Sequence, residues 1–248
     1  MLSAEETERY QRQMMIFGED GQAGLKGSSV LIAGAGGLGS PVAYYLAVAG
    51  VGHIRIVDHD RVERSNLNRQ ILHGEGSVGV FKTDSARDSL MRLNPDISID
   101  ARSVTIDEAT IGSLCDQIDV IVDAMDNYPA RYLLNRMAIE RDIPLVHGAI
   151  HGFNGQATTI IPGETACLRC LFPDPPPKET FPVIGVTPGI IGLIQAHEVL
   201  KYLLGIGTLL RNRLVLWDGL SCSLEELPVE RDPHCEDCKK KTRYEVTK

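Results

Sequence analysis

Residues 29–39 of this chain read SVLIAGAGGLG and predict a strand followed by a tight turn. The first five residues are mostly apolar and suit a buried strand, and the glycines that follow permit a tight turn. Residues 40–49 (SPVAYYLAVA) then have the composition of a buried helix, with Pro41 in the first turn, where proline is tolerated. A membrane span is a poorer explanation of this uncharged run, because seven glycines and Pro41 interrupt residues 27–52.

Strands and helices continue to alternate after this unit. Up to residue 141 we expect strand 53–58, helix 82–93, a strand near Ile99, a helix around Glu108, strand 119–124 and helix 130–141. This order predicts an α/β fold with a doubly wound, mainly parallel, Rossmann-like sheet and right-handed crossovers. In the C-terminal part we expect antiparallel strands: strands 144–149, 156–161 and 213–217, with helix 190–204 and a proline-rich loop at 173–182.

The length of 248 residues is compatible with a single domain. Ser3 and Glu6 have the spacing of a capping box, which predicts a first helix that runs to about Met15. The expected parts of the domain are a helical arm at 1–27, a nucleotide-binding half at 28–150, and a second half at 151–248 that ends in a solvated tail, KKKTRYEVTK.

Charge and the amino terminus exclude several classes of function. A net charge of −8 and a pI near 5.4 argue against a nucleic-acid-binding or anionic-membrane surface, because both partners would repel an acidic protein. The amino-terminal MLSAEETERYQRQ is charged and lacks the apolar core of a signal peptide, which predicts a cytoplasmic protein with reduced thiols.

The glycine turn has the spacing of a nucleotide-binding motif. Gly34, Gly36, Gly37 and Gly39 form the pattern G-x-G-x-x-G between the expected strand and helix, where a phosphate can approach the helix N-terminal amides. Asp58 follows Gly39 by 19 residues, at the end of the second strand, where a carboxylate can accept hydrogen bonds from ribose hydroxyls. The simpler alternative is tight helix–strand packing. The motif does not determine which nucleotide binds, so a nicotinamide oxidoreductase is an alternative.

Polar residues after the second strand favour a triphosphate. The segment from Asp60 to Gln70 (DRVERSNLNRQ) contains Asn66, which could orient a triphosphate, and Arg69, which could clamp it. Lys82, at the start of the next helix, adds an ammonium group. The simpler alternative is that Arg69 is a surface ion-pair residue.

Carboxylates follow a later strand in the sequence DAMDN, where Asp123 and Asp126 precede Asn127. One carboxylate suffices for a magnesium ion that also binds phosphate oxygens and water. The simpler alternative for Asp123 is that it caps or braces the turn.

Four cysteines predict a metal site. Cys167-x-x-Cys170 and Cys235-x-x-Cys238 are separated by 64 residues and suit tetrahedral zinc coordination by four thiolates. Such a site has no open position, so the zinc would be structural and would pin the C-terminal segment to the loop beyond the sheet. Redox dithiols are the alternative.

These motifs together resemble those of the MoeB/ThiF/HesA family, which is related to the activating domain of ubiquitin-activating enzymes. The resemblance spans nearly the whole chain and rests on both cysteine pairs and on RYQRQ at 9–13, GAGGLGS at 34–40, VDHDRVERSNLNRQ at 57–70, VGVFK at 78–82 and DAMDN at 123–127. It implies an adenylyltransferase that uses ATP and Mg²⁺ to activate the C-terminal glycine of a ubiquitin-like sulfur carrier, similar to MoaD or ThiS, with release of pyrophosphate. Residues 151–248 would then bind the carrier.

The resemblance also implies roles for individual residues. Nucleotide contacts are implied for Gly34, Gly36, Gly37, Gly39, Asp58, Asp60, Asn66, Arg69, Gln70, Lys82, Asp126 and Asn127. The implied catalytic residues are Arg69 and Lys82 on the phosphates, Asp126 on magnesium, and Arg12. Arg12 would match an arginine finger that reaches the active site of the other subunit, which implies a homodimer.

One feature departs from the family pattern. Many relatives have a cysteine after the first C-x-x-C pair that is a candidate for a covalent link to the carrier, but this chain has none between Cys170 and Cys222. Two interpretations remain open: the acyl-adenylate is the final product, or the substrate is another carboxylate, in a peptide or a small acid. The pathway (molybdopterin, thiamin or tRNA thiolation) stays open as well. A non-catalytic scaffold is a further alternative, which Arg12, Arg69, Lys82 and Asp126 argue against.

Overall fold

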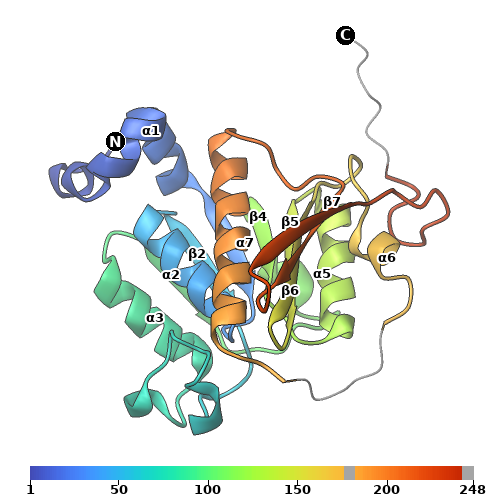
Figure 1. The fold of residues 1–248 in the computed structure, drawn as a ribbon. Coiled ribbons are helices and arrows are strands. Elements are labelled where there is room, and N and C mark those ends of the chain that lie inside the picture. Colours follow the sequence, from blue (N-terminus) through green and yellow to red (C-terminus); the bar gives the residue numbers. More distant parts are fainter. Residues whose placement is uncertain (176–181, 242–248) are drawn as a thin grey trace.

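The computed structural model describes residues 1–175 and 182–241, which contain an eight-stranded sheet with helices on both faces (Figure 1). The strand order is β3-β2-β1-β4-β5-β6-β7-β8. The strands are β1 (Ser29–Ala33), β2 (His53–Val57), β3 (Ser98–Arg102), β4 (Val120–Asp123), β5 (Leu145–His151), β6 (Asn154–Ile160), β7 (Arg213–Asp218) and β8 (Ser223–Pro228). Pairing is parallel from β3 to β5 and antiparallel from β5 to β8. The predicted fold class is therefore confirmed.

Helices on the two faces bury the sheet. The helices are α1 (Ala4–Gly27), α2 (Gly39–Ala49), α3 (Lys82–Leu93), α4 (Ile111–Leu114), α5 (Tyr128–Arg141), α6 (Leu168–Leu171) and α7 (Val186–Leu204), with 3-10 turns at η1 (Arg64–Asn66) and η2 (Glu75–Ser77). In β1, Val30 and Ile32 pack with residues of α2 and α7, whereas Leu31 and Ala33 pack with residues of α5. Burial on both faces explains why β1 is apolar without alternation.

Two glycines place the start of α2 at the carboxyl end of β1. Gly34 has a φ of +104°, and a Cβ there would lie 2.6 Å from the carbonyl oxygen of Ala124. A Cβ on Gly39 would lie 1.9 Å from the carbonyl oxygen of Gly34, so no side chain fits. The N-terminus of α7 comes to the same edge, because a Cβ on Gly37 would lie 3.3 Å from Pro188. The first turns of α2 and α7 therefore meet beside the glycine turn.

The largest differences in element boundaries from the sequence prediction are in three helices. The first helix continues past Met15 to Gly27, with a break at Gly18, whose φ of +73° glycine tolerates. The helix expected around Glu108 is a short one, α4, because Asp107 and Thr110 form a turn first. Helix α7 begins at Val186 rather than at residue 190.

Strand β8 was not expected from the sequence. Its residues, SLEELP, are exposed at every position and lack the apolar alternation of a half-buried strand. It forms because β7 offers a free edge to pair with. Of the predicted solvated tail, residues 239–241 are described, and Lys241 is not simply solvated: it donates to Ile139 O at 2.8 Å and pairs with Asp142. Residues 242–248 of the tail, and residues 176–181 of the expected proline-rich loop, lie outside the described residues.

Within the described ranges, none of the helices combines the length and the apolar character that a bilayer crossing needs.

Candidate functional site

The glycine turn is held so that its carbonyls face the protein. Ala35 donates its N–H to Asp58 Oδ2 at 2.9 Å, and its carbonyl oxygen accepts from His73 Nε2 at 3.0 Å. The carbonyl oxygen of Gly36 accepts from Ser40 Oγ at 2.7 Å. In the described part of the chain, the N–H groups of Gly36 and Gly37, just before α2, donate to no other group, so these amides are available to an anion. The role of His73 was missed from the sequence, where a single buried histidine gives no signal.

Asp58 and Lys82 both contact Asp60. Asp58 Oδ1 accepts from the backbone N–H of Asp60 at 2.9 Å. Lys82, which is only 6% exposed, places its Nζ 2.8 Å from Asp60 Oδ2. Burial acts to raise the pKa of Asp60, but the hydrogen bond and charge of Lys82 outweigh it, so the pKa lies below its usual value. The structure thus brings the predicted ribose acid and the predicted phosphate cation together.

The segment after β2 lies against the N-terminus of α7. Arg69 Nη1 donates to Ser65 O and to Asn68 Oδ1, both at 3.0 Å, so in the described part of the chain its guanidinium contacts neutral oxygens rather than an acid. The surface ion-pair alternative therefore finds no support. Asn66 and Gln70 are buried, and Gln70 Oε1 has no hydrogen-bond partner among the described residues. A Cβ on Gly36 would lie 3.6 Å from Gln70 Nε2, which places this amide beside the glycine turn.

The two carboxylates of DAMDN have different environments. Asp123 is fully buried, and its carboxylate accepts from His147 Nδ1 at 2.7 Å and from the N–H of Met125 at 3.0 Å. Asp126 is exposed and receives a hydrogen bond from Asn127 Nδ2 at 3.3 Å. Asp123 therefore braces the turn, as its simpler alternative held, and Asp126 is the carboxylate with room for a cation. Asn127 caps α5 by accepting from the N–H of Ala130.

A cavity of about 540 Å³ opens across the carboxyl ends of β2, β3 and β4. Its lining comes from the segments after these strands and from α5: His59, Thr105, Ile106, Asp107, Glu108, Met125, Asn127, Pro129, Ala130, Tyr132, Leu133 and Arg136. His59 follows the predicted ribose acid, and Met125 precedes Asp126. The sequence prediction missed most of this lining. The one feature of the sequence that could have indicated this lining is the position of residues 105–108 shortly after a strand of the parallel sheet, where ligands bind in open α/β folds.

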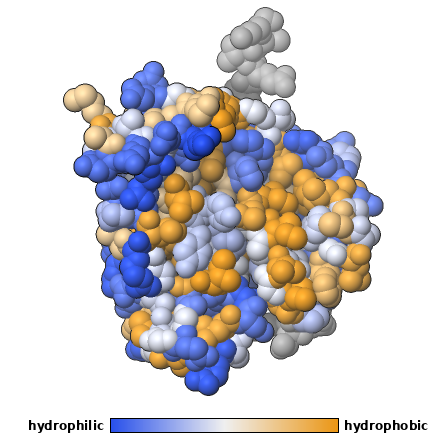
Figure 2. Space-filling view, turned by 60° about the vertical axis from the view of Figure 1, so that its left-hand side comes forward, coloured by the Kyte–Doolittle hydropathy of each residue, from blue (hydrophilic) through white to orange (hydrophobic). Residues whose placement is uncertain are grey.

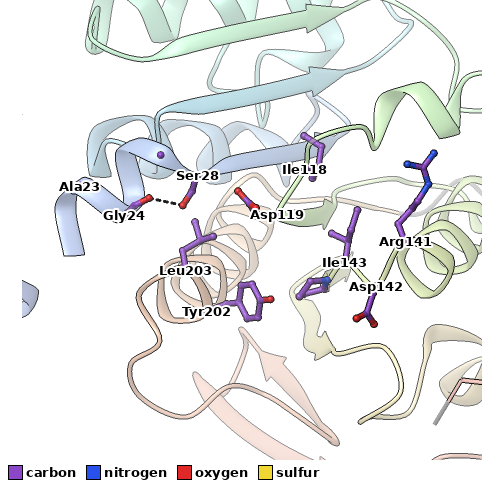
Figure 3. Close-up of a pocket in the computed structure, with 12 residues that line it drawn as sticks. Ala23, Gly24, Ser28, Ile118, Asp119, Arg141, Asp142, Ile143, Tyr202 and Leu203 are labelled. Atoms are coloured by element: carbon purple, nitrogen blue, oxygen red, sulfur yellow. Dashed lines mark hydrogen bonds between the residues drawn. The ribbon is translucent and has the colours of Figure 1, made fainter. Parts of the chain in front are cut away.

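A second cavity lies at the opposite, amino edge of the sheet (Figure 3). It measures about 640 Å³ and is lined by the end of α1, the turn before β4, the turn between α5 and β5, and the end of α7. Its charged groups are engaged: Asp119 accepts from the N–H of Ser29, and Arg141 pairs with Asp116. The candidate site is therefore the carboxyl edge, because the glycine turn and the acids lie there.

The four predicted zinc ligands converge. The Sγ atom of Cys167 lies 3.8 Å from that of Cys170 and 3.6 Å from that of Cys235, and the Sγ atoms of Cys170 and Cys238 are 3.5 Å apart. Bonds of about 2.3 Å to a central tetrahedral ion would separate sulfurs by about 3.8 Å, so the cluster has the dimensions of a metal site.

The amide of Asn135, on α5, connects both cysteine pairs. Its Oδ1 accepts from the N–H of Leu168 at 2.9 Å, and its Nδ2 donates to Asp237 Oδ2 at 2.8 Å. Leu168 follows Cys167, and Asp237 precedes Cys238. The C-terminal segment is therefore attached to the helix that begins beside Asp126. This buried asparagine was also missed from the sequence.

Arg12 is not brought to the site of its own chain. It is exposed on α1, which docks on the body through Tyr10, whose hydroxyl accepts from Asn94, and through Gln13, which donates to Ala49 O. Ala49 is the last residue of α2, whereas the glycine turn is at the first, and 11 helical residues span about 16 Å. Met15 and Ile16, on the same helix as Arg12, are 80% and 78% exposed. The space-filling view with this side brought forward shows apolar patches among polar ones (Figure 2).

Comparisons with known proteins find relatives of this chain. The ThiF family matches residues 10–238. The chain is 44% identical over 245 residues to the SAMP-activating enzyme E1 of Haloferax volcanii, covering 96% of this chain and 90% of that protein. It is 44% identical over 247 residues to the sulfur carrier protein adenylyltransferase of Thermus thermophilus, covering 94% and 91%.

A solved structure of E. coli MccB with MccA-N7isoASN has a TM-score of 0.84 to this fold, at 23% identity, over 96% of this chain and 75% of that chain. At that identity the likeness speaks for the fold alone. The extent and identity of the sequence matches decide the family: this chain belongs to the ThiF family.

Proposed function

We propose that this protein is an ATP-dependent adenylyltransferase that activates the C-terminal glycine carboxylate of a ubiquitin-like sulfur carrier. The observation that carries the proposal is the convergence, at one edge of the sheet, of the glycine turn, Asp58, Lys82 and the exposed Asp126. The names of the two relatives above, a SAMP-activating enzyme and a sulfur carrier protein adenylyltransferase, support the choice of substrate class.

The nucleotide would lie across the carboxyl ends of β1, β2 and β4. The cavity beside His59 would hold adenine, Asp58 would accept hydrogen bonds from the ribose, and the amides of Gly36 and Gly37 would face the phosphates. The guanidinium of Arg69 contacts two neutral oxygens, so its positive charge would be available to the triphosphate. Gln70, whose Oε1 has no partner in the described chain, would complete the site beside Gly36.

The reaction would form a bond between a carboxylate oxygen of the carrier and the α-phosphorus of ATP. The bond from that phosphorus to the bridging oxygen would break, and its electron pair would leave with pyrophosphate. Lys82 and Arg69 would stabilise the charge that develops there, because cations positioned beforehand need no reorganisation. Magnesium, which Asp126 would bind, neutralises phosphate charge when present. The carrier is negatively charged at its reacting end, and no covalent protein intermediate is required.

We also propose a homodimer in which Arg12 acts on the partner's site. Arg12 is exposed on a helix that docks at the end of α2 far from its own glycine turn, and the exposed Met15 and Ile16 beside it are apolar enough to be covered by a second copy. The four cysteines would hold a structural zinc ion, since four thiolates at these separations satisfy a tetrahedral ion and leave no open position.

ATP–pyrophosphate exchange with magnesium, measured with and without ubiquitin-like carriers that end in Gly-Gly, tests the proposal. We expect exchange only with a carrier. A matched carrier that lacks its last glycine should support none, because the reacting carboxylate would no longer reach the phosphate. If exchange requires a peptide or a small acid instead, the protein is an adenylyltransferase with a different substrate. If no carrier, peptide or small acid supports exchange, the result contradicts adenylation.

A further inference from the structure

The loop that carries Asp126 cannot be fixed by Asp126 itself. Strand β4 ends at Asp123 and α5 begins at Tyr128, so four residues connect them. The carboxylate of Asp126 is exposed, and its one side-chain hydrogen bond in the described chain comes from the neighbouring Asn127 at 3.3 Å. Other groups must therefore determine where this carboxylate points.

Met125, directly before Asp126, is held at both of its backbone groups. Its N–H donates to Asp123 Oδ1 at 3.0 Å, and its carbonyl oxygen accepts from Arg131 Nε at 3.1 Å and from Arg131 Nη2 at 2.6 Å. Beyond Asp126, the cap that Asn127 forms on α5 fixes the other side of the loop. The backbone at Asp126 is thus set by its neighbours.

The groups that hold Met125 are buried and mutually paired. Asp123 and His147 are 0% exposed and Arg131 is 7% exposed. His147 Nδ1 donates to Asp123 Oδ2 at 2.7 Å, while Arg131 Nε lies 3.7 Å from the same oxygen. The negative charge of Asp123 and the positive charge of Arg131 cancel, so His147 is neutral and carries its proton on Nδ1. Its Nε2 can therefore accept a hydrogen bond from Gln156 Nε2 at 3.4 Å.

We propose that Arg131 and His147 are positioning residues that act through Asp123 and Met125 to set the carboxylate of Asp126. A buried ion pair costs desolvation, and an apolar cluster of the same volume would stabilise the fold at least as well. What this network adds is a loop with little freedom, because each of its groups is tied to a partner. The inference rests on the proposed function, since the magnesium role of Asp126 belongs to it.

A double-mutant cycle tests the coupling. Arg131→Lys keeps the buried charge but loses the two-nitrogen contact with Met125 O, so it should fold while loosening the loop. We expect its kcat for ATP–pyrophosphate exchange to fall roughly 10- to 100-fold, with a smaller change in the KM for ATP and a higher magnesium requirement. If Arg131 acts through Asp126, adding Arg131→Lys to Asp126→Asn should cost the residual activity little more.

Arg141→Lys is the matched control, because Arg141 is on the same helix and pairs with Asp116 away from the loop. It should keep the activity of the unaltered protein. Losses that multiply in the double variant would overturn the inference while leaving the proposed function intact. Full, magnesium-dependent turnover by Asp126→Asn would instead remove Asp126 from the proposed function.

Amide hydrogen exchange in residues 120–130 tests the positioning without any activity. His147→Leu removes the donor to Asp123 at similar volume, whereas His147→Asn keeps an N–H near the position of Nδ1. We expect faster exchange in this segment for His147→Leu and Arg131→Lys, and near-normal exchange for His147→Asn. Unchanged protection in both disruptive variants would refute the positioning role, whatever the kinetics.

Discussion

The ammonium of Lys82 lies 2.8 Å from the carboxylate of Asp60, and of this pair the lysine is buried while the acid is half exposed. An incoming phosphate could therefore replace or share the acid without uncovering the lysine. The arrangement keeps a cation at the edge of the nucleotide site in the absence of ligand. Substitution of Lys82 and substitution of Asp60 should therefore have different effects.

Lys82→Met should reduce ATP–pyrophosphate exchange by about 10²- to 10³-fold, the usual loss when one preorganised charge-stabilising group is removed. Asp60→Asn should reduce it less. It should also lower the melting temperature of the ligand-free protein and increase the shift that ATP produces, because the phosphate would then supply the missing partner of Lys82. Thermal denaturation with and without ATP measures this. An equal ATP shift in Asp60→Asn and the unaltered protein would contradict the explanation.

Gly39→Ala should destabilise the protein by about 3 kcal/mol, because the added Cβ would lie 1.9 Å from Gly34 O and the packed backbone would have to move. Gly76→Ala is the matched control. A Cβ there has nothing within 4 Å, so it should be neutral or slightly stabilising. Urea unfolding compares the two. Equal stability of both variants would mean that the contact at the glycine turn relaxes without cost.

Arg12→Ala and Lys82→Ala should each be nearly inactive, yet a mixture of the two should regain about one quarter of the original activity. In a randomly mixed population half the dimers are mixed, and each has one site with an intact Lys82 and the partner's intact Arg12. Exchange activity after subunits are mixed measures this. The trans role would be refuted by heterodimers of verified composition that stay inactive.

Cys235→Ser should lose the metal and lower the melting temperature by roughly 5–10 °C, because the C-terminal segment would no longer be pinned beside α5. Cys222→Ser is the control, since Cys222 is exposed and lies outside the cluster. Metal analysis of the purified variants accompanies the melting curves. A metal-free protein with unchanged stability would argue against a structural zinc site.

Stability should fall on mild acidification, in part through His73. Burial, which outweighs the hydrogen bond to Ala35 O, lowers the pKa of this histidine. Because the unfolded chain then binds the proton more readily, the free energy of unfolding is highest above the unfolded pKa near 6.5 and declines as the pH falls toward the folded value.

His73→Gln removes this titration and can still offer an N–H to Ala35 O. Urea unfolding at about pH 7.5 and pH 5.5 should show a smaller loss in the variant than in the unaltered protein. His147, whose pKa burial also lowers, should maintain part of the loss in both proteins. The same pH dependence in variant and unaltered protein would exclude a contribution from His73.

Features that depend on neighbours along the chain could be predicted from the sequence. The turn from Gly34 to Gly39, the acid at Asp58 and the alternation of strands and helices are local patterns with few structural solutions, so the fold class followed from them. The two C-x-x-C pairs predicted their own convergence, because four thiolates in this spacing suit a single metal ion. Family resemblance then indicated the chemistry.

Chemically identical groups could be distinguished only from their three-dimensional surroundings. Asp123 and Asp126 are three residues apart in sequence, yet one is buried against His147 and the other is exposed, because their burial depends on β5 and α5. Strand β8 pairs with the edge of β7, and no pattern in its sequence SLEELP predicts a strand. The supports of the site, His73, Arg131 and Asn135, are distant in sequence from what they hold, and long-range hydrogen bonds of this kind leave no periodic trace in a single sequence.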